Sequence, residues 1–185
     1  AGALPMIRAR LTLAHALDRA EAKLRRLAER LGWPQAWLQE FQAYLAQPRR
    51  TSEEFWVRYT LLRMDAEKML KPLMTEAEAH AFYRTHSYML WRNLVHRRHS
   101  AWRRVLCTMA PGAGAMLEYG CGIAPVSAWL RDRRPGWTFA LADLDSPHLR
   151  YARWRLGDRD VQWTSYDVVT ALDVFEHLAT PITSV

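Results

Sequence analysis

The segment 116–125 constrains the fold of this chain more than any other part of its sequence. A short apolar run ends in Glu118, and Gly120 and Gly122 follow it closely. Pro125 then stands where the first residue of a helix is expected, because its missing N–H is not needed there. Glycines suit a tight turn in which a ligand approaches the backbone. The segment therefore predicts a strand, a glycine turn that accepts a ligand, and a helix.

A second apolar run ends in Asp143, which follows Gly122 by 21 residues. This spacing is close to the one at which an acidic residue after a second strand accepts hydrogen bonds from ribose hydroxyls. Asp145 is the competing candidate, although Ser146 and Pro147 predict the start of a helix and place Asp145 in the turn. An acidic loop residue without a ligand is the alternative interpretation of Asp143.

A third apolar run, over residues 166–172, predicts a buried parallel strand and is followed by Asp173, Glu176 and His177. The three segments together resemble the class I S-adenosylmethionine (SAM) dependent methyltransferases. The matching patterns are Glu-x-Gly-x-Gly, the acidic residue after the second strand, and Asp-x-x-Glu-His. The resemblance covers about residues 105–185 and nothing before them.

The resemblance implies an α/β fold with a Rossmann-like sheet, and SAM bound where its first strands end. The cofactor-binding residues that it implies are Glu118, Gly120, Cys121, Gly122, Asp143, Leu144 and Asp173. An acceptor hydroxyl needs a base, and His177 with Glu176 beside it is the catalytic candidate. That these two residues only begin a helix and shape the loop is the alternative.

Two other interpretations of the glycine turn stay open. The dinucleotide fingerprint Gly-x-Gly-x-x-Gly requires glycine at the position of Pro125, and it brings a diphosphate to a helix N-terminus. SAM carries no phosphate, and its amino group favours a carboxylate such as Glu118. A strand-to-helix turn without any ligand is the other interpretation.

The chain departs from the family in three places. Ala124 stands at the third small position of the first motif, and it leaves room for the cofactor. Only Thr164 and Ser165 separate the expected third strand, residues 161–163, from the next run. The chain ends at Val185, whereas the family fold continues with further strands. We therefore expect the sheet to be incomplete at its C-terminal side, because its last strand would leave an unpaired edge.

Composition predicts a soluble globular protein, with 50% apolar and 24% charged residues. Cys107 and Cys121 form no disulfide framework, which indicates a reducing compartment and a cytoplasmic location. No apolar stretch has the length of a membrane span, and no secretory leader is evident. We interpret Cys121 as a small side chain in the turn, because nucleophilic use of its thiol needs a base partner that the sequence does not identify.

Charge is distributed unevenly along the chain. Residues 1–104 contain 19 Lys and Arg against 10 Asp and Glu, whereas residues 105–185 contain 7 against 9. Nearly all of the basic residues are arginine, which binds carboxylates and phosphates with two hydrogen bonds. The excess of arginine in residues 1–104 therefore indicates that this part binds a small, anionic acceptor, an acidic partner or nucleic acid. Of these, nucleic acid is not favoured. A solvated helix surface is the alternative.

The first part of the chain has helical periodicity, which predicts an all-helical domain over residues 1–110 before a SAM-binding domain over residues 111–185. Apolar residues recur at steps of three and four within 7–31. Thr75 and Glu78 form a predicted capping box at the start of a long helix toward Leu106. The face of the preceding helix is formed by Phe55, Tyr59, Leu62, Ala66, Met69 and Leu73.

The segment 80–104 interleaves aromatic residues with arginine and histidine. Segments before the first strand often cover the cofactor in this family, and the resemblance makes Tyr83, Tyr88 and Trp91 substrate-binding candidates. Packing onto the sheet, nucleic-acid stacking and a metal shared by two histidines are the alternatives. We predict no metal site.

Three functions remain in competition. The favoured one is a small-molecule methyltransferase with a helical lid. The second is an RNA-directed ribose methyltransferase, whose metal-binding motif resembles Asp173-x-x-Glu176-His177 with Asp in place of Glu. The third is a non-catalytic partner subunit that keeps the fold, and intact Glu118, Gly120 and Asp143 count against it. The sequence leaves the acceptor atom and the oligomeric state open.

Overall fold

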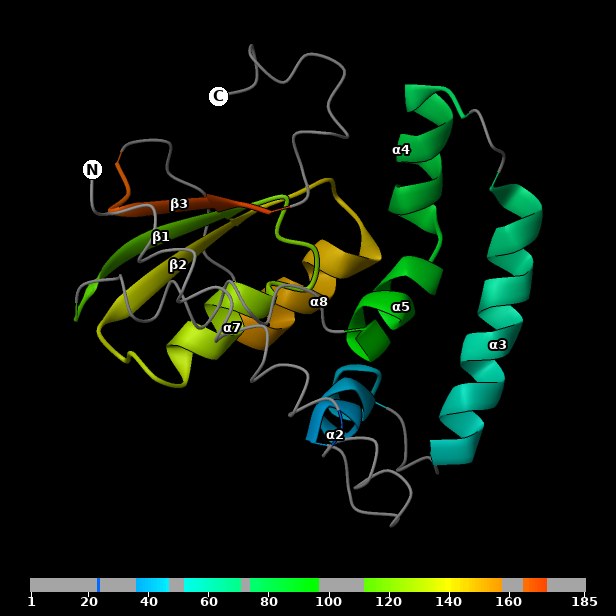
Figure 1. Ribbon diagram of the computed structural model, residues 1–185, viewed down its shortest axis with the longest axis horizontal. Helices are drawn as coiled ribbons and strands as arrows, with labels where there is room; N and C mark the ends of the chain where they lie inside the picture. Colours follow the sequence, from blue (N-terminus) through cyan, green and yellow to red (C-terminus); the bar gives the residue numbers. More distant parts are fainter. Residues whose placement is uncertain are drawn as a thin grey trace.

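The computed structural model describes residue 23 and the ranges 36–46, 52–70, 74–96, 112–157 and 165–172. Within these ranges the chain forms six helices and three strands (Figure 1). In chain order they are α2 (Ala36–Tyr44), α3 (Ser52–Met69), α4 (Glu76–Thr85), α5 (Tyr88–His96), β1 (Gly114–Tyr119), α7 (Pro125–Arg131), β2 (Trp137–Ala142), α8 (Pro147–Leu156) and β3 (Val168–Ala171).

The described strands form one parallel sheet in the order β2-β1-β3, which confirms the α/β class. Glu118 of β1 lies opposite Leu141 of β2 and Thr170 of β3. Helices α7 and α8 follow β1 and β2 and cover the same face of the sheet (Figure 1). From β1 the chain continues to β2 on one side of β1, and it later returns to β3 on the other side. The carboxyl end of β1 therefore lies at a topological switch point. Ligands of open α/β sheets bind at such points.

Apolar side chains of the sheet pack against α7 and α8 in two clusters. One cluster consists of Met116, Val126, Leu130 and Trp137, and the other of Cys121, Ala124, Leu141, Leu149 and Ala152. Trp137 and Leu141 lie four residues apart on β2 and face the same side, because alternate residues of a strand do so. This packing fixes the position at which β1 and β2 end.

A third cluster joins the helices to the sheet region. Its buried members are Trp37, Leu38, Phe41, Phe55, Leu90, Trp91, Leu94, Ile123 and Tyr151. Ile123 belongs to the turn after β1 and Tyr151 to α8, whereas the other members come from α2, α3 and α5. The division at residues 110 and 111 stays a prediction, and the two segments share this core.

The capping box at the start of α4 is confirmed. Thr75 Oγ1 accepts a hydrogen bond from the Glu78 N–H at 3.2 Å, and the Glu78 carboxylate accepts one from the Thr75 N–H at 2.9 Å. The expected helical stretch toward Leu106 consists, within the described residues, of two helices, α4 and α5, with an interruption at His86. The His86 backbone is extended, and its ring Nδ1 accepts the Tyr88 N–H at 3.1 Å at the start of α5.

The predicted inner face of α3 is confirmed in part. Phe55 and Ala66 are buried and Tyr59 is half-buried, but Met69 is exposed near the end of the helix. Trp37 and Trp91 are core residues, whereas Trp56 is exposed. Among the helices within the described ranges, none is both long and apolar enough to cross a membrane.

Candidate functional site

The turn after β1 has the backbone conformation that its glycines suggested. Gly120 and Gly122 have φ values of 62° and 52°, in the left-handed region where a Cβ is strained. Ala124 also lies in this region, with a φ of 49°, and Pro125 begins α7 as predicted. The turn is closed by a 2.7 Å hydrogen bond from the Ala124 N–H to the Cys121 carbonyl. Backbone atoms rather than side chains therefore form much of this loop's surface.

Glu118, the one acidic residue of β1, binds the first turn of α7. Its carboxylate accepts the Ser127 N–H at 2.8 Å, the Ser127 hydroxyl at 2.6 Å and the Val126 N–H at 3.4 Å. Ala124 stands at the N-cap position and makes no side-chain capping bond. Glu118 therefore takes the place of an N-cap side chain and satisfies the N–H groups that a helix start leaves without partners.

The Glu118 carboxyl group titrates in an unusual range. Only 5% of the residue is exposed, and burial raises its pKa from 4.5 to about 7. The hydrogen bonds from Ser127 and Val126 oppose this rise because they favour the ionised form. Near neutral pH this group is thus partly ionised at the amino end of α7.

Asp143 joins the ends of β1 and β2. Its carboxylate accepts the Gly122 N–H at 2.6 Å and the Leu144 N–H at 2.7 Å. Asp145 is exposed and forms an ion pair with Arg150 at 3.1 Å. Of the two acidic candidates, Asp143 is therefore the one that lies against the glycine turn.

A histidine that the sequence analysis did not single out lies beside Asp143. His148 is buried in α8, and burial lowers its pKa, against the charge of Asp143 and a hydrogen bond to the Met89 backbone. Burial in turn raises the pKa of Asp143, while the N–H groups of Gly122 and Leu144 lower it. His148 thus connects α5 to the carboxylate at the end of β2. Its place in the second position of α8 gave no pattern that would have revealed this role.

Helix α5 also approaches the glycine turn directly. The side-chain amide nitrogen of Asn93 lies 3.8 Å from the position that a Cβ on Gly122 would occupy. Ile123 packs in the same cluster as Leu90 and Trp91. Figure 1 shows α4 and α5 beyond the end of the sheet toward which the strands point. Asn93 was not among the predicted site residues because a single Asn in an aromatic segment carries no periodic pattern.

Cys121 is a buried free cysteine within the turn. Burial raises the pKa of its thiol well above the usual value, and the nearby Asp143 and Glu118 charges add to this rise. The thiol is therefore protonated at neutral pH and is a poor nucleophile.

The three substrate-binding candidates lie in different surroundings. Trp91 is buried and stacks on Phe55, with ring centroids 4.7 Å apart. The half-buried Tyr88 ring lies 5.9 Å from that of Tyr59. Tyr83 is exposed on α4. Their role in binding a substrate stays a prediction.

The proposed cofactor residues come together in part. Glu118, Gly120, Cys121, Gly122, Asp143 and Leu144 lie at the carboxyl ends of β1 and β2. Asp173, Glu176, His177 and Cys107 lie outside the described residues. Within the ranges that are described, no group of three or more His, Cys, Asp or Glu side chains is arranged to hold a metal ion.

The chain was compared with protein-family models, curated proteins and solved structures. None of these comparisons gave a match. Any functional assignment therefore depends on the residues and geometry of the site itself.

Proposed function

We propose that this protein is a SAM-dependent methyltransferase that acts on a small-molecule acceptor. The observation that carries the proposal is the bond between the Asp143 carboxylate and the Gly122 N–H. This bond places the acidic residue after β2 against the glycine turn after β1. Both lie at the carboxyl edge of a parallel sheet whose strand order reverses at β1. The fold proposed with this function is the Rossmann-like methyltransferase sheet.

The residues at this edge fit a cofactor with a ribose and an amino acid end. Gly120 and Gly122 offer backbone without side chains, so that a ligand can approach closely. The Asp143 carboxylate has room for about four hydrogen bonds and uses two for Gly122 and Leu144. Its remaining capacity suits the two ribose hydroxyls. Asp173 is proposed as a further cofactor contact from the sequence alone.

The contacts of Glu118 favour SAM over a dinucleotide. A diphosphate would need the N–H groups at the start of α7, and those of Val126 and Ser127 already bind Glu118. A partly ionised carboxylate at this position also repels a diphosphate. The amino group of SAM is positively charged and tolerates this neighbour.

The chemistry requires alignment more than activation by the protein. SAM supplies a methyl group already activated by its sulfonium, so the chain has to orient the acceptor and receive its proton. We propose His177, with Glu176 beside it, as the base for a hydroxyl acceptor. Helix α5, with Asn93 beside the turn, is proposed as part of the cover over the site.

Calorimetric titration with S-adenosylhomocysteine (SAH) tests this function. We expect binding with a Kd on the order of micromolar and no binding of NAD. Gly120→Arg should abolish SAH binding, because its φ of 62° and the close approach both exclude a side chain. Gly112→Arg is the matched control, since a Cβ on Gly112 meets nothing within 4 Å. Binding of NAD but not SAH by the folded protein would overturn the proposal.

A further inference from the structure

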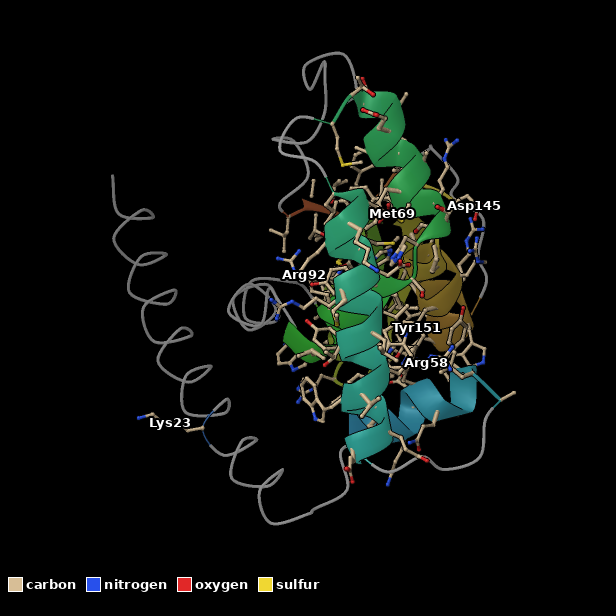
Figure 2. All side chains as sticks on the ribbon, turned by 90° about the vertical axis from the view of Figure 1, so that its right-hand side faces the viewer. Lys23, Arg58, Met69, Arg92, Asp145 and Tyr151 are labelled. Carbon is tan, nitrogen blue, oxygen red and sulfur yellow. The ribbon has the colours of Figure 1, made fainter. Side chains whose placement is uncertain are left out.

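Helix α3 presents apolar residues on two opposite faces. Its inner face contains the buried residues Phe55 and Ala66. On its outer face, Val57 is 56% exposed, Leu61 62% and Met64 54%. At about 100° per residue, these three side chains lie within a narrow stripe opposite the inner face. Figure 2 looks onto the side of the molecule where α3 is the foremost described helix.

The apolar stripe ends in opposite charges. Glu53 precedes it by one turn and Lys68 follows it by one turn, on the same side of the helix. The stripe is also symmetric, because Val57 and Met64 are equally far from its midpoint, as are Glu53 and Lys68. A second α3 laid antiparallel across it would therefore bring Val57 opposite Met64 and Glu53 opposite Lys68, twice.

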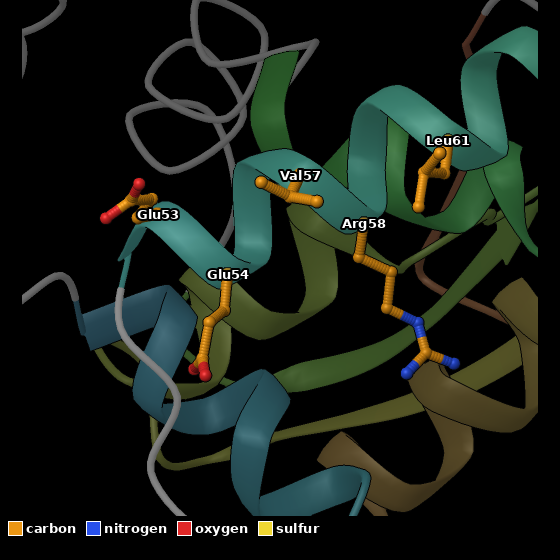
Figure 3. A pocket seen from close by; sticks show the side chains of 5 residues that line it. All are labelled: Glu53, Glu54, Val57, Arg58 and Leu61. Carbon is orange, nitrogen blue, oxygen red and sulfur yellow. The ribbon is translucent and has the colours of Figure 1, made fainter.

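The outer face of α3 has a hollow at Val57, where the antiparallel pairing would place Met64 of the second helix. The hollow is lined by Glu53, Glu54, Val57, Arg58 and Leu61, all from α3 (Figure 3). Residues 54, 57, 58 and 61 have the spacing of the four residues that form a hole in knobs-into-holes packing. A methionine from a facing helix suits such a hole, because its flexible side chain fills irregular gaps.

We propose that two copies of this chain associate through the outer faces of their α3 helices, antiparallel and related by a two-fold axis. Met64 of each copy enters the hollow of the other, and Glu53 pairs with Lys68 at both ends. The contact is confined to one helix per copy, so it belongs to the small interfaces and gives a Kd on the order of micromolar or weaker. The stripe faces away from α5, so the pairing leaves the carboxyl edge of the sheet open. The inference does not depend on the proposed function.

Sedimentation velocity over a range of concentrations tests the association. We expect the full chain to shift from monomer to dimer as its concentration rises. Leu61→Glu should weaken this dimer at least tenfold, since it places two carboxylates near the two-fold axis. Val169→Thr is the control, because it removes an equally exposed apolar side chain on β3. Circular dichroism checks that both variants are folded.

Charge reversal tests both the antiparallel orientation of the helices and the identity of the partner as a second copy of this chain. Glu53→Lys and Lys68→Glu should each weaken the dimer about three- to tenfold, because each reversal affects two exposed ion pairs. The double variant should recover the original association. A chain that stays monomeric at every concentration, or a dimer that Leu61→Glu leaves unchanged, would overturn the proposal. Failure of the double variant to recover association would overturn the antiparallel pairing.

Discussion

The turn after β1 and the core between α2, α3 and α5 are stabilised by different kinds of contact. In the turn, the carboxylates of Glu118 and Asp143 bind backbone N–H groups at defined positions. In the helical core, rings pack on one another, both stacked, as Trp91 on Phe55, and edge to face, as Phe41 against Trp91 with centroids 4.9 Å apart. Hydrogen bonds depend on particular atoms, whereas ring packing depends on volume and shape.

This difference teaches which part of the molecule tolerates change. A conservative change of volume in the helical core is accommodated by neighbouring rings, whereas loss of one carboxylate leaves buried donors without partners. The two regions meet where Ile123 and Tyr151 join the ring cluster and where Asn93 lies beside Gly122. The hydrogen-bonded backbone of the glycine turn therefore lies on the polar side of this junction.

The largest effect is expected in the helical core. Phe41 is 1% exposed and contacts rings from α3, α5 and α8. Phe41→Ala should lower the free energy of unfolding by about 3–5 kcal/mol, because it removes apolar contact and leaves a cavity. Urea denaturation measures the change. Phe41→Leu should lose much less, and an equal loss for both variants would show that buried volume does not govern the stability of this core.

At Glu118, the free energy of unfolding should depend on the hydrogen-bonding groups of the side chain rather than on its volume. Glu118→Ala leaves the Ser127 N–H and hydroxyl and the Val126 N–H without their acceptor, which should cost about 3 kcal/mol. Glu118→Gln keeps an oxygen acceptor of the same shape and should cost less than about 1 kcal/mol at about pH 5, where the carboxyl group of the folded wild type is protonated. Denaturation at this pH distinguishes the two variants. If Glu118→Gln were as unstable as Glu118→Ala, the capping role would be wrong.

The pH dependence of stability sharpens the same comparison. Because the folded-state pKa of Glu118 is raised from 4.5 to about 7, the folded protein binds more protons than the unfolded chain between these values. The free energy of unfolding should therefore fall as pH rises through this window, by about 2–3 kcal/mol from this group between about pH 5 and about pH 8. The difference in the free energy of unfolding between wild type and Glu118→Gln isolates the contribution of Glu118 from those of Asp143 and His148. A difference that does not change with pH would contradict the raised pKa.

The smallest effect is expected at the junction of the two regions. Asn93→Ala should weaken SAH binding about fivefold, the amount expected from one lost hydrogen bond, and leave the urea midpoint nearly unchanged. Arg92→Ala on the same helix is the matched control for binding. An affinity equal to that of wild type would remove α5 from the proposed cofactor site.

The sheet region could be predicted largely because its structure follows from local rules. Gly120, Gly122 and Pro125 predicted a turn and a helix start, and Ser146 caps α8 with Pro147 at its first position. The spacing between Gly122 and Asp143 predicts a ribose-binding carboxylate, whereas the contact that the structure contains is the hydrogen bond from the Gly122 N–H to this carboxylate. In each case the residue type suits a particular backbone conformation or capping position, at a known distance along the sequence from the turn or helix start.

Other features depend on partners that are distant in the sequence. Glu118 accepts hydrogen bonds from the α7 N-terminus, and Asn93 lies close to Gly122. Both contacts require the tertiary arrangement. The interruption at His86 arises because its ring competes with the helix for the Tyr88 N–H. Periodicity also predicted only one apolar face for α3, whereas the exposed Val57, Leu61 and Met64 form a second.

The most direct test of the central claim compares the two neighbouring acidic residues after β2. Asp143 binds the Gly122 N–H, whereas Asp145 is exposed and paired with Arg150. In SAH titrations, Asp143→Ala should lose at least tenfold in affinity and Asp145→Ala should bind like wild type, with circular dichroism confirming that both are folded. Equal affinity of the two variants, or stronger loss in Asp145→Ala, would contradict the proposed cofactor site at the junction of β1 and β2.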